Sequence, residues 1–501
     1  MIRPSGKEGV FMKQPGNLCY KDILIDRLVA KLRQAGDLRA YEASSLLRLE
    51  IDVDGLVLFD WLAAQKAAVK VHWANRRGDF EAAGIGAADV LTDDTCDAVT
   101  DVLAEIDRRV ATADGAVRYY GGIAFDPEHD QSDLPREGKA CLAPTLYGGE
   151  IVPDRRPWRG FGRFRFFVPR IELRRERGDT TLAVNIGRTP DDTVETLEQE
   201  VLCAIDEVVF DVEPAPDGST PEPPRILRRT DLPGRTTWCA MVSDTMHDVA
   251  GGALDKLVLF RQAVLAMSAP VDPAILLNHI ARHSAGAYSF CFQLGPHDAF
   301  LGASPECLYS RLGADIYSEA IAGTVLSGST DAERRYHRGL LSDSAKDCEE
   351  HAYVFDGVRR GLERLCRKVR VIDRRDIVSL GYVQHFCSRF AGRLRDDVAT
   401  ADIVAALHPT AAVNGHPRQA ALEHIRAREP FARGWYAGPV GWIGAEASEF
   451  AVAIRSARVL DDQISLFAGA GIVRGSDPDS EWDETENKLS LFLNAIGRRT
   501  P

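Results

Sequence analysis

Three charged residues near the C-terminal end of the chain could act together on one ligand. Glu481, Glu484 and Lys488 are spaced i, i+3 and i+7, so a helix would place two carboxylates and one ammonium on the same face. Gly469 and Gly471 precede them, and glycine lets the backbone come close to a ligand. This stretch predicts half of a site for a metal ion and a carboxylate substrate, with a solvated helix as the alternative.

A second acidic pair lies upstream in the segment SAKDCEEH. Asp347 and Glu350 are i and i+3 on a predicted helix, flanked by Lys346 and His351. Magnesium takes a few oxygen ligands and keeps several waters, so one carboxylate from each of two helices plus a substrate carboxylate would satisfy it. We predict that the carboxylates of Glu350 and Glu484 come close enough to share one ion. A solvated charged face is the alternative.

Two further residues could transfer protons. Lys256 stands at the start of the apolar segment KLVLFR, and Glu306 ends GASPE, where Pro305 stiffens the turn. Only a neutral lysine accepts a proton, which costs an ordinary lysine about 4 kcal/mol at pH 7. A general acid must stay protonated near neutral pH, so Glu306 would need a raised pKa. The alternatives are a lysine that snorkels to solvent and an ordinary acidic turn.

The C-terminal half also holds isolated polar signals. An arginine within the apolar strand predicted at 450–459 is expensive to bury alone, so we expect Arg455 to pair with a protein group or a substrate carboxylate. Each other signal has a core or capping role as its alternative. These signals include Gly323 and Thr324 in IAGT, Gln384 and His385, His408 to Thr410, and Arg433 to Tyr436.

The composition narrows the class of protein. Of 501 residues, 45% are hydrophobic and 27% are charged, as in soluble globular proteins with ample core. A net charge of -13 leaves no basic footprint for nucleic acid or an anionic membrane. Ten cysteines are scattered without CxxC pairs or zinc-like spacing. Without a leader pattern or an uncharged apolar run of about 18 residues, we expect a soluble, cytoplasmic protein with reduced thiols.

Hydrophobic periodicity predicts an α+β protein with antiparallel sheets, because the many strands lack a regular βαβ rhythm. Residues 1–20 predict a flexible lead-in, and 214–224 is the strongest linker candidate. Helices are predicted at 20–36, 95–113, 191–206, 236–251, 272–283, 342–369 and 403–407. Strands are predicted at 115–125, 256–261, 288–292, 299–301, 315–321, 435–443, 450–459 and 463–468, with two more in 159–185.

Ordered motifs from Lys256 to Lys488 resemble those of the chorismate-binding enzymes. They are KLVLFR, FLGASPE, AIAGT, KDCEEH, VQHF, LHPTAAVNGHP, EPFARGWYAGPVGW, EFAVAIRSA, LFAGAGIV and EWDETENK. The resemblance implies one domain of two packed antiparallel sheets with surrounding helices, in which 214–224 is a surface loop. The expected divisions are an N-terminal extension at 1–50 and a single domain at 51–501, with a half of lower motif content at 51–225 and a catalytic half at 226–501.

The resemblance also implies Mg²⁺-dependent chemistry on chorismate. By position in the motifs, Lys256 would be the base that activates water for attack at ring C2. Glu306 would be the acid that protonates the departing C4 hydroxyl. The metal ligands would be Glu350 and Glu484, and the supporting acids would be Asp347 and Glu481. The substrate would meet Gly323, Thr324, His385, Tyr436, Arg455, Gly469, Gly471 and Lys488.

Within the family, the motifs favour isochorismate synthase, with a product that feeds menaquinone or siderophore and salicylate synthesis. Ala322 stands where aminodeoxychorismate synthases tend to have lysine, the HPT motif at His408 is typical of isochorismate synthases, and Lys256 suits a water nucleophile. The departures from the family pattern are Ala411 in place of proline, Asn414, and residues 325–327.

Two rival functions remain at this point. One is a salicylate synthase, which would also eliminate pyruvate from isochorismate. The other is an inactive relative that serves as a binding or scaffold subunit, although the intact Lys256, Glu306, Glu350 and Glu484 argue against it. We expect a monomer or weak homodimer whose partner is chorismate, and neither nucleic acid nor a membrane.

Overall fold

Two antiparallel sheets form the framework of the computed structural model, which describes residues 20–34, 45–129, 158–210, 221–328, 330–380 and 383–497. The 12-stranded sheet has the order β1 (Ser45–Asp52), β8 (Asp179–Arg188), β7 (Ile171–Glu176), β3 (Phe80–Ile85), β2 (Lys70–Ala74), β11 (Tyr288–Gly295), β12 (Asp298–Ser304), β20 (Ser456–Leu460), β21 (Gln463–Ile472), β10 (Lys256–Met267) and β17 (Gly415–His416), and β9 (Ile226–Leu232) also pairs with β10.

The 9-stranded sheet has the order β15 (Cys366–Leu380), β16 (Val383–Leu394), β14 (Asp315–Leu326), β13 (Cys307–Leu312), β19 (Ala447–Val452), β18 (Pro439–Gly444), β5 (Arg118–Ile123), β6 (Phe164–Val168) and β4 (Asp89–Thr92). These two sheets confirm the predicted α+β class. The expected lead-in and most of segment 214–224 lie outside the described residues.

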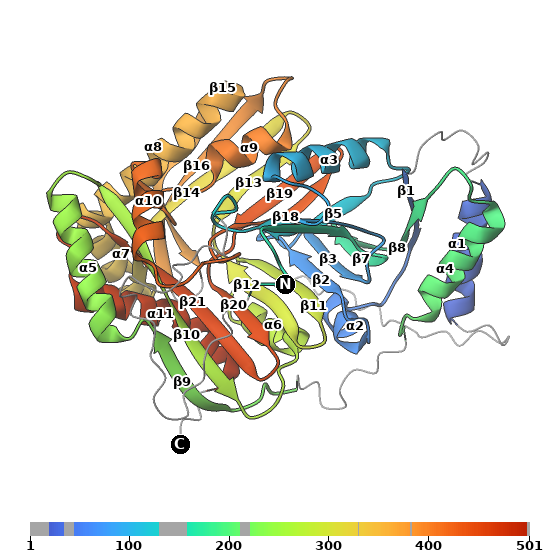
Figure 1. Ribbon diagram of the computed structural model, residues 1–501, viewed down its shortest axis with the longest axis horizontal. Coiled ribbons are helices and arrows are strands. Elements are labelled where there is room, and N and C mark those ends of the chain that lie inside the picture. The colour runs from blue at the N-terminus through green and yellow to red at the C-terminus, as the bar shows by residue number, and fades with distance from the viewer. Residues whose placement is uncertain are drawn as a thin grey trace, which may run out of the picture.

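Helices surround the sheets (Figure 1). Helix α8 packs on β14 to β16, α11 packs on β21 and on α5 and α6, and α1 and α4 pack together on β1 and β8. The helices are α1 (Tyr20–Gln34), α2 (Leu58–Ala64), α3 (Val99–Thr112), α4 (Val194–Asp206), α5 (Arg235–Ala250), α6 (Pro273–Arg282), α7 (Asp331–Asp343), α8 (Ala345–Leu365), α9 (Thr400–Leu407), α10 (Arg418–Arg428) and α11 (Pro478–Ile496).

The largest hydrophobic cluster joins the two sheets. Trp73 and Phe260 from the 12-stranded sheet and Phe166 and Phe450 from the 9-stranded sheet all belong to it and are almost fully buried. Burial of such side chains contributes about 2–3 kcal/mol each. A second cluster lies under α1, α2 and α4, and a third lies between α6, α11 and the 12-stranded sheet. The packing therefore holds α11 rigidly beside the strands that it must face.

Segment 159–185 differs from its prediction. Three strands are present instead of two, because the expected first strand is split at Pro169 into β6 and β7. Proline has no backbone N–H to continue a ladder. The chain leaves the 9-stranded sheet after β6 and enters the 12-stranded sheet at β7, where β7 pairs with β3 and β8.

The helix predicted at 342–369 is shorter in the structure. It starts as α8 after Ser344, whose hydroxyl accepts a hydrogen bond from the Asp347 backbone N–H at 3.1 Å, as an N-cap does. It ends at Leu365, and β15 follows at once and pairs with β16. The β-branched residues Val369 and Val371 favour a strand here, so the prediction placed the end of this helix too late.

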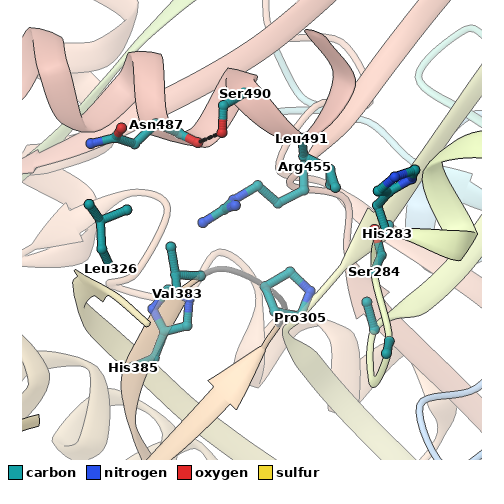
Figure 2. Close-up of a pocket in the computed structure, with 13 residues that line it drawn as sticks. His283, Ser284, Pro305, Leu326, Val383, His385, Arg455, Asn487, Ser490 and Leu491 are labelled. Carbon is teal, nitrogen blue, oxygen red and sulfur yellow. Dashed lines mark hydrogen bonds between the residues drawn. The ribbon is translucent and has the colours of Figure 1, made fainter. Parts of the chain in front are cut away.

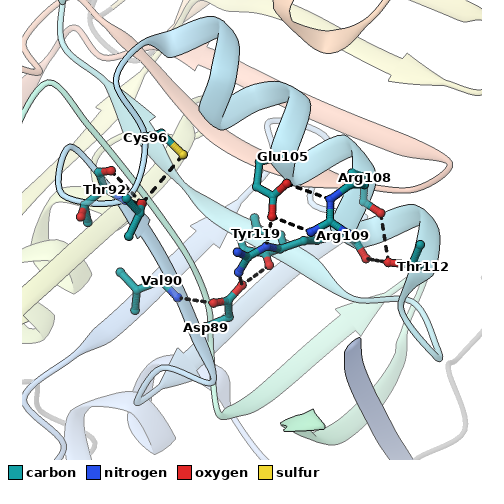
Figure 3. Close-up of polar contacts among 10 residues, drawn as sticks. Asp89, Val90, Thr92, Cys96, Glu105, Arg108, Arg109, Thr112 and Tyr119 are labelled. Carbon is teal, nitrogen blue, oxygen red and sulfur yellow. Dashed lines mark hydrogen bonds and ion pairs between the residues drawn. The ribbon is translucent and has the colours of Figure 1, made fainter. Parts of the chain in front are cut away.

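Helix α3 is tied to the 9-stranded sheet by a polar cluster (Figure 3). Asp89 in β4 accepts hydrogen bonds from Arg109 in α3, at 2.5 Å, and from the Tyr119 hydroxyl in β5. Glu105 accepts hydrogen bonds from Arg108 and Arg109. The bond from Arg108, together with Arg109, lowers the pKa of Glu105 to about 2 despite partial burial. The cluster thus fixes α3 through charge-assisted hydrogen bonds.

Both sheets draw strands from both expected halves of the chain. In the 12-stranded sheet β2 pairs with β11, and in the 9-stranded sheet β5 pairs with β18. The expected division at residue 50 falls inside β1, which pairs with β8 along its whole length. The folded unit therefore includes residues that the sequence assigned to an extension. Among the described residues, no helix combines the length and apolar character needed to cross a membrane.

Candidate active site

A cleft of about 710 Å³ lies where β14, β16 and α8 meet β10, β21 and α11. In Figure 1 these elements gather in the half of the molecule away from α1 and α4. Its lining includes ten of the predicted site residues: Glu306, Gly323, Thr324, Glu350, His385, Tyr436, Arg455, Gly469, Glu484 and Lys488. The other four predicted residues, Lys256, Asp347, Gly471 and Glu481, stand behind this lining.

Helix α11 confirms the helix predicted from the spacing of its charges. It begins after Asp477, whose carboxylate accepts a hydrogen bond from the Ser480 backbone N–H at 2.9 Å. Glu484 and Lys488 then face the cleft and form an ion pair at 2.6 Å. The Lys488 ammonium also donates to the Gly469 carbonyl at 2.8 Å. The helix is thereby joined to β21 at the floor of the cleft.

Lys256 is fully buried at the start of β10, and its ammonium lies 2.9 Å from Oε1 of Glu350. The pair fits there because Gly471 has no side chain. A Cβ at this position would lie 2.6 Å from Oε1 of Glu350 and 2.9 Å from Cε of Lys256. Gly471 therefore makes room for the ion pair, whereas the prediction placed it against the substrate.

The two supporting acids sit on opposite helices. The Lys346 ammonium of α8 donates to Oε1 of Glu481 in α11 at 2.5 Å. Burial and the nearby charge of Glu484 raise the pKa of Glu481. Burial, with a smaller effect of the Glu350 charge, raises the pKa of Asp347. The acids of α8 and α11 thus form one electrostatic group, as the paired-helix prediction requires.

The residues around this group fit a hard divalent cation. Their donor atoms are carboxylate oxygens, which Mg²⁺ prefers, and Oε2 of Glu481 is buried without a hydrogen bond. Among the described residues, no three acidic, histidine or cysteine side chains already converge on one point. Lysines hold Glu350, Glu481 and Glu484 instead. The sharing of one ion by Glu350 and Glu484 stays a prediction, supported by their place in one cleft.

Glu306 lies in the turn between β12 and β13 with its side chain in the cleft. Burial raises its pKa to about 7, although the Thr410 hydroxyl donates to Oε1 at 3.2 Å and the Lys256 charge opposes the rise. The backbone N–H of Glu306 donates to the Ser304 hydroxyl at 3.2 Å. The carboxyl group is therefore positioned, water-poor and substantially protonated near neutral pH, as a proton donor should be.

Arg455 does not lie within a strand, contrary to its prediction. The expected strand 450–459 is divided into β19 of one sheet and β20 of the other, and Arg455 joins them with a φ of 51°. A positive φ is uncommon for a residue other than glycine. This turn directs the guanidinium into the cleft, where it has no hydrogen bond or ion pair with any described residue. Burial lowers the pKa of Arg455. An anionic ligand would therefore offset the free energy lost when the charged guanidinium is removed from water.

His385 offers a neutral acceptor beside Arg455. Its Nδ1 lies 3.1 Å from the Gly323 carbonyl and 3.0 Å from the Thr324 hydroxyl, so Nδ1 carries the proton and donates to the carbonyl. Burial, with the Arg455 charge, lowers the pKa of His385 to about 3. Its Nε2 is buried without a partner among the described residues. A ligand hydroxyl could therefore donate to Nε2.

A second cavity of about 550 Å³ adjoins the cleft and shares Pro305, His385 and Arg455 with it. Figure 2 shows the Arg455 guanidinium projecting into the space between Asn487 of α11 and His385. The loop after α6 forms another wall of this cavity. A ligand in either space would meet the same cation.

Two residues of the site were not assigned a role from the sequence. In the sequence Thr410 is only one member of the HPT motif, yet in the structure it donates to Glu306. Lys346 only flanks the acidic pair in the sequence, yet it neutralises Glu481. The signal for Thr410 was its motif, whereas the Lys346 contact joins two helices and has no local signature.

The chain is similar to known proteins of one family. A family model described as chorismate binding enzyme matches residues 30–497. The chain is 33% identical to a chloroplastic isochorismate synthase of Catharanthus roseus over 72% of this chain, and it spans 64% of that protein's length. It is 29% identical to isochorismate synthase MenF of Escherichia coli (strain K12), over 87% of this chain and 90% of the relative.

A solved structure gives the same picture. The structure of MenF, the menaquinone-specific isochorismate synthase from Escherichia coli, superposes with a TM-score of 0.77 at 27% identity. The match covers 95% of this chain and 100% of that one. The likeness therefore extends over both sheets and is not confined to the motif-bearing half.

Proposed function

This chain belongs to the family of chorismate binding enzymes, and we propose that it is an isochorismate synthase that converts chorismate to isochorismate with Mg²⁺. Support comes from relatives of that activity that match most of the chain. One observation supports the proposal most. Glu306, a buried acid with a pKa of about 7, shares a cleft with the unpaired guanidinium of Arg455.

In the proposed reaction Arg455 and Lys488 bind the anionic groups of chorismate, since charge-assisted hydrogen bonds to carboxylates are the strongest available. His385 accepts from a substrate hydroxyl through Nε2. Tyr436 forms part of the cleft wall, stacked on Phe260 at 5.1 Å between ring centroids. These contacts would hold the ring in one orientation, which lowers the entropic part of the barrier.

The hydroxyl exchange needs two proton transfers. The Lys256 ammonium, which pairs with Glu350, must first lose a proton. As a neutral amine it then takes a proton from the water that attacks ring C2, and Glu306 gives its proton to the hydroxyl that leaves C4. The ring double bonds shift between these positions, so one water enters, one leaves, and the product is an isomer of the substrate. Lys256 lies behind Glu350 in the structure, so it would act from the wall of the cleft.

The cation would be held by Glu350 and Glu484, with Asp347 and Glu481 in support. When bound, Mg²⁺ would offset the charge of the substrate's ring carboxylate and hold it against the cleft. The pathway is part of the proposal: menaquinone synthesis is favoured because MenF of Escherichia coli covers nearly the whole chain. A cytoplasmic location and a monomer or weak homodimer remain predictions.

The test is to incubate the purified protein with chorismate and Mg²⁺ and to separate the products by HPLC. Isochorismate as the main product is expected. Abundant salicylate and pyruvate without an added lyase would show a salicylate synthase instead. Complete absence of chorismate consumption, by a protein that still binds chorismate, would favour an inactive binding relative.

A further inference from the structure

Arg76, in the loop after β2, connects three parts of the chain near the cleft. Its Nη1 donates to the Pro305 carbonyl at 3.0 Å and pairs with Glu319 of β14, and its Nε donates to the Gly286 carbonyl at 3.2 Å. Its side chain is only 16% exposed. One carbonyl belongs to the turn that carries Glu306, and the other belongs to the loop after α6 that forms a wall of the second cavity.

Glu319 is itself held firmly, and its charge acts on Glu306. It is 4% exposed, and it accepts a hydrogen bond from the Tyr317 hydroxyl at 2.5 Å. Arg389 lies 3.8 Å away on its other side. A buried, preoriented carboxylate therefore holds the guanidinium of Arg76. This ion pair keeps Arg76 in place for its hydrogen bonds to the Pro305 and Gly286 carbonyls.

Few other hydrogen bonds hold the turn that carries Glu306. Ser304 and the backbone of Glu306 bond to Val452 of β19, and Thr410 bonds to the carboxyl group. Only Arg76 among the described residues donates a side-chain hydrogen bond to the Pro305 carbonyl, which belongs to the peptide unit that enters Glu306. The N–H of the same peptide unit donates to the Ser304 hydroxyl at 3.2 Å, so Arg76 and Ser304 hold its two sides. Loss of Arg76 would leave the peptide held on one side, and the Glu306 side chain that follows it would be less well aligned.

We propose that Arg76 is a positioning residue for Glu306, the proposed proton donor: its guanidinium fixes the Pro305–Glu306 peptide and the loop at Gly286, and it balances much of the charge of Glu319. The inference rests on the proposed function, because that function assigns the proton transfer to Glu306. The charges of Lys256 and Glu319 also act on Glu306, and Glu319 raises its pKa. Loss of Arg76 would leave that negative charge with only the more distant Arg389, at 3.8 Å, as an ion-pair partner among the described residues.

The test compares Arg76→Ala and Arg76→Lys with the control Arg335→Ala, which changes an exposed arginine. For Arg76→Ala we expect a fall in kcat of about 10- to 100-fold with KM changed less than about threefold, in line with the cost of a misplaced catalytic group. The pH above which kcat falls should move upward. For Arg76→Lys the charge remains, so this pH should stay near that of the wild type while kcat is still reduced.

Folding is followed by the thermal midpoint of each variant. A wild-type kcat and pH profile in folded Arg76→Lys and Arg76→Ala would overturn the proposal. So would a loss of activity in proportion to lost stability, with an unshifted pH profile, because Arg76 would then be structural only. If Arg76→Ala does not fold, Arg76→Lys decides alone through its kcat.

A second readout needs no turnover and separates this inference from the proposed function. The pH at which Glu306 titrates is read from its carboxyl carbon resonance, assigned with Glu306→Gln. An upward shift in Arg76→Ala, absent in Arg335→Ala, supports the coupling even if chorismate is not the substrate. An unchanged titration would refute it even if the wild type makes isochorismate.

Discussion

The Lys256 ammonium lies 2.9 Å from Oε1 of Glu350, so the proposed base and a proposed metal ligand form an ion pair. Two similar pairs stand nearby, Lys346 with Glu481 and Lys488 with Glu484. Positive side chains thus hold the oxygens that a divalent cation would need. Cation affinity should therefore depend on how strongly these lysines hold the carboxylates.

Replacement of Lys346 by methionine should tighten Mg²⁺ binding by about tenfold or more, because it removes a positive charge that competes for Glu481. Calorimetric titration of the protein with Mg²⁺ alone measures the affinity. Lys66→Met, which changes an exposed lysine, is the matched control. Equal affinities in both variants would show that Lys346 does not compete with the ion.

Substitution of Lys256 by methionine should reduce turnover by about 100- to 10,000-fold, the usual range for loss of a general base. The methionine keeps the apolar stem in its buried position, so the effect comes from the amine. Chorismate conversion by HPLC gives kcat, and equilibrium dialysis gives chorismate affinity, which should change far less. Turnover within about fivefold of the wild type would exclude Lys256 as the base.

The activity of the wild type should fall as the pH rises through about 7, because Glu306 must carry a proton to act as the acid and its pKa is about 7. Glu306→Gln should lose about 100-fold or more of the turnover at pH 6 and should lack this decline in its residual rate. A profile of the same shape in both proteins would assign the decline to another group.

Stability should respond to the same carboxyl group. Between pH 4.5, the ordinary value, and about 7, folded Glu306 keeps a proton that the unfolded chain releases. The raised pKa therefore contributes stability that is complete below pH 4.5 and is lost as the pH rises to about 7. Glu306→Gln should match the wild type at pH 4 and exceed its unfolding free energy by up to about 3 kcal/mol at pH 8 in urea denaturation.

Arg455→Lys should raise KM for chorismate by about 10- to 100-fold, because lysine keeps the charge but cannot form paired hydrogen bonds with a carboxylate. Competition by a simple dicarboxylate should weaken in parallel. An unchanged KM would place the substrate carboxylate elsewhere. Arg458→Lys is an unsuitable control, since that residue pairs with Asp298 inside the fold, so exposed Arg335→Lys serves instead.

Glu172→Gln should destabilise the fold by about 3 kcal/mol, because it removes the charge paired with the buried Arg48 at 2.8 Å. The Tyr120 hydroxyl of the other sheet also donates to Glu172 at 3.2 Å. Glu50→Gln is the matched control, since Glu50 bonds the same arginine but is half-exposed, and it should cost less than about 1 kcal/mol. Equal losses in urea denaturation would contradict the buried-pair argument.

The local parts of the site could be predicted from the sequence. The face of α11 that carries Glu484 and Lys488 follows from helical spacing alone, and the Glu306 turn follows from its proline and its place between apolar segments. The sheets were predictable as a class because strands and helices alternate without a βαβ rhythm. The strand boundaries were harder to predict. The chain passes from one sheet to the other at Pro169 and at Arg455, and each of these residues lies inside a segment that the sequence predicts as one continuous strand.

The remaining features depend on contacts between distant segments. Nothing near Arg455 in the sequence encodes a left-handed turn, since its φ of 51° is set by strands of two sheets that it joins. The pairs of Lys256 with Glu350 and Lys346 with Glu481 exist only after α8 meets β10 and α11. Arg76 ends the segment VHWANR in the half of the chain with fewer motifs, and nothing in that segment indicates a contact with Pro305.

The interleaving of the two sheets has a consequence for biosynthesis. Strands early in the chain pair with strands that are synthesised much later. Helix α11, which carries Glu484 and Lys488, follows every other described element. The ribosome therefore releases most of the polypeptide before its sheets can close. A nascent chain stalled before α11 would contain Glu306 and Lys256, the proposed proton donor and base, but the cleft would lack Glu484 and Lys488.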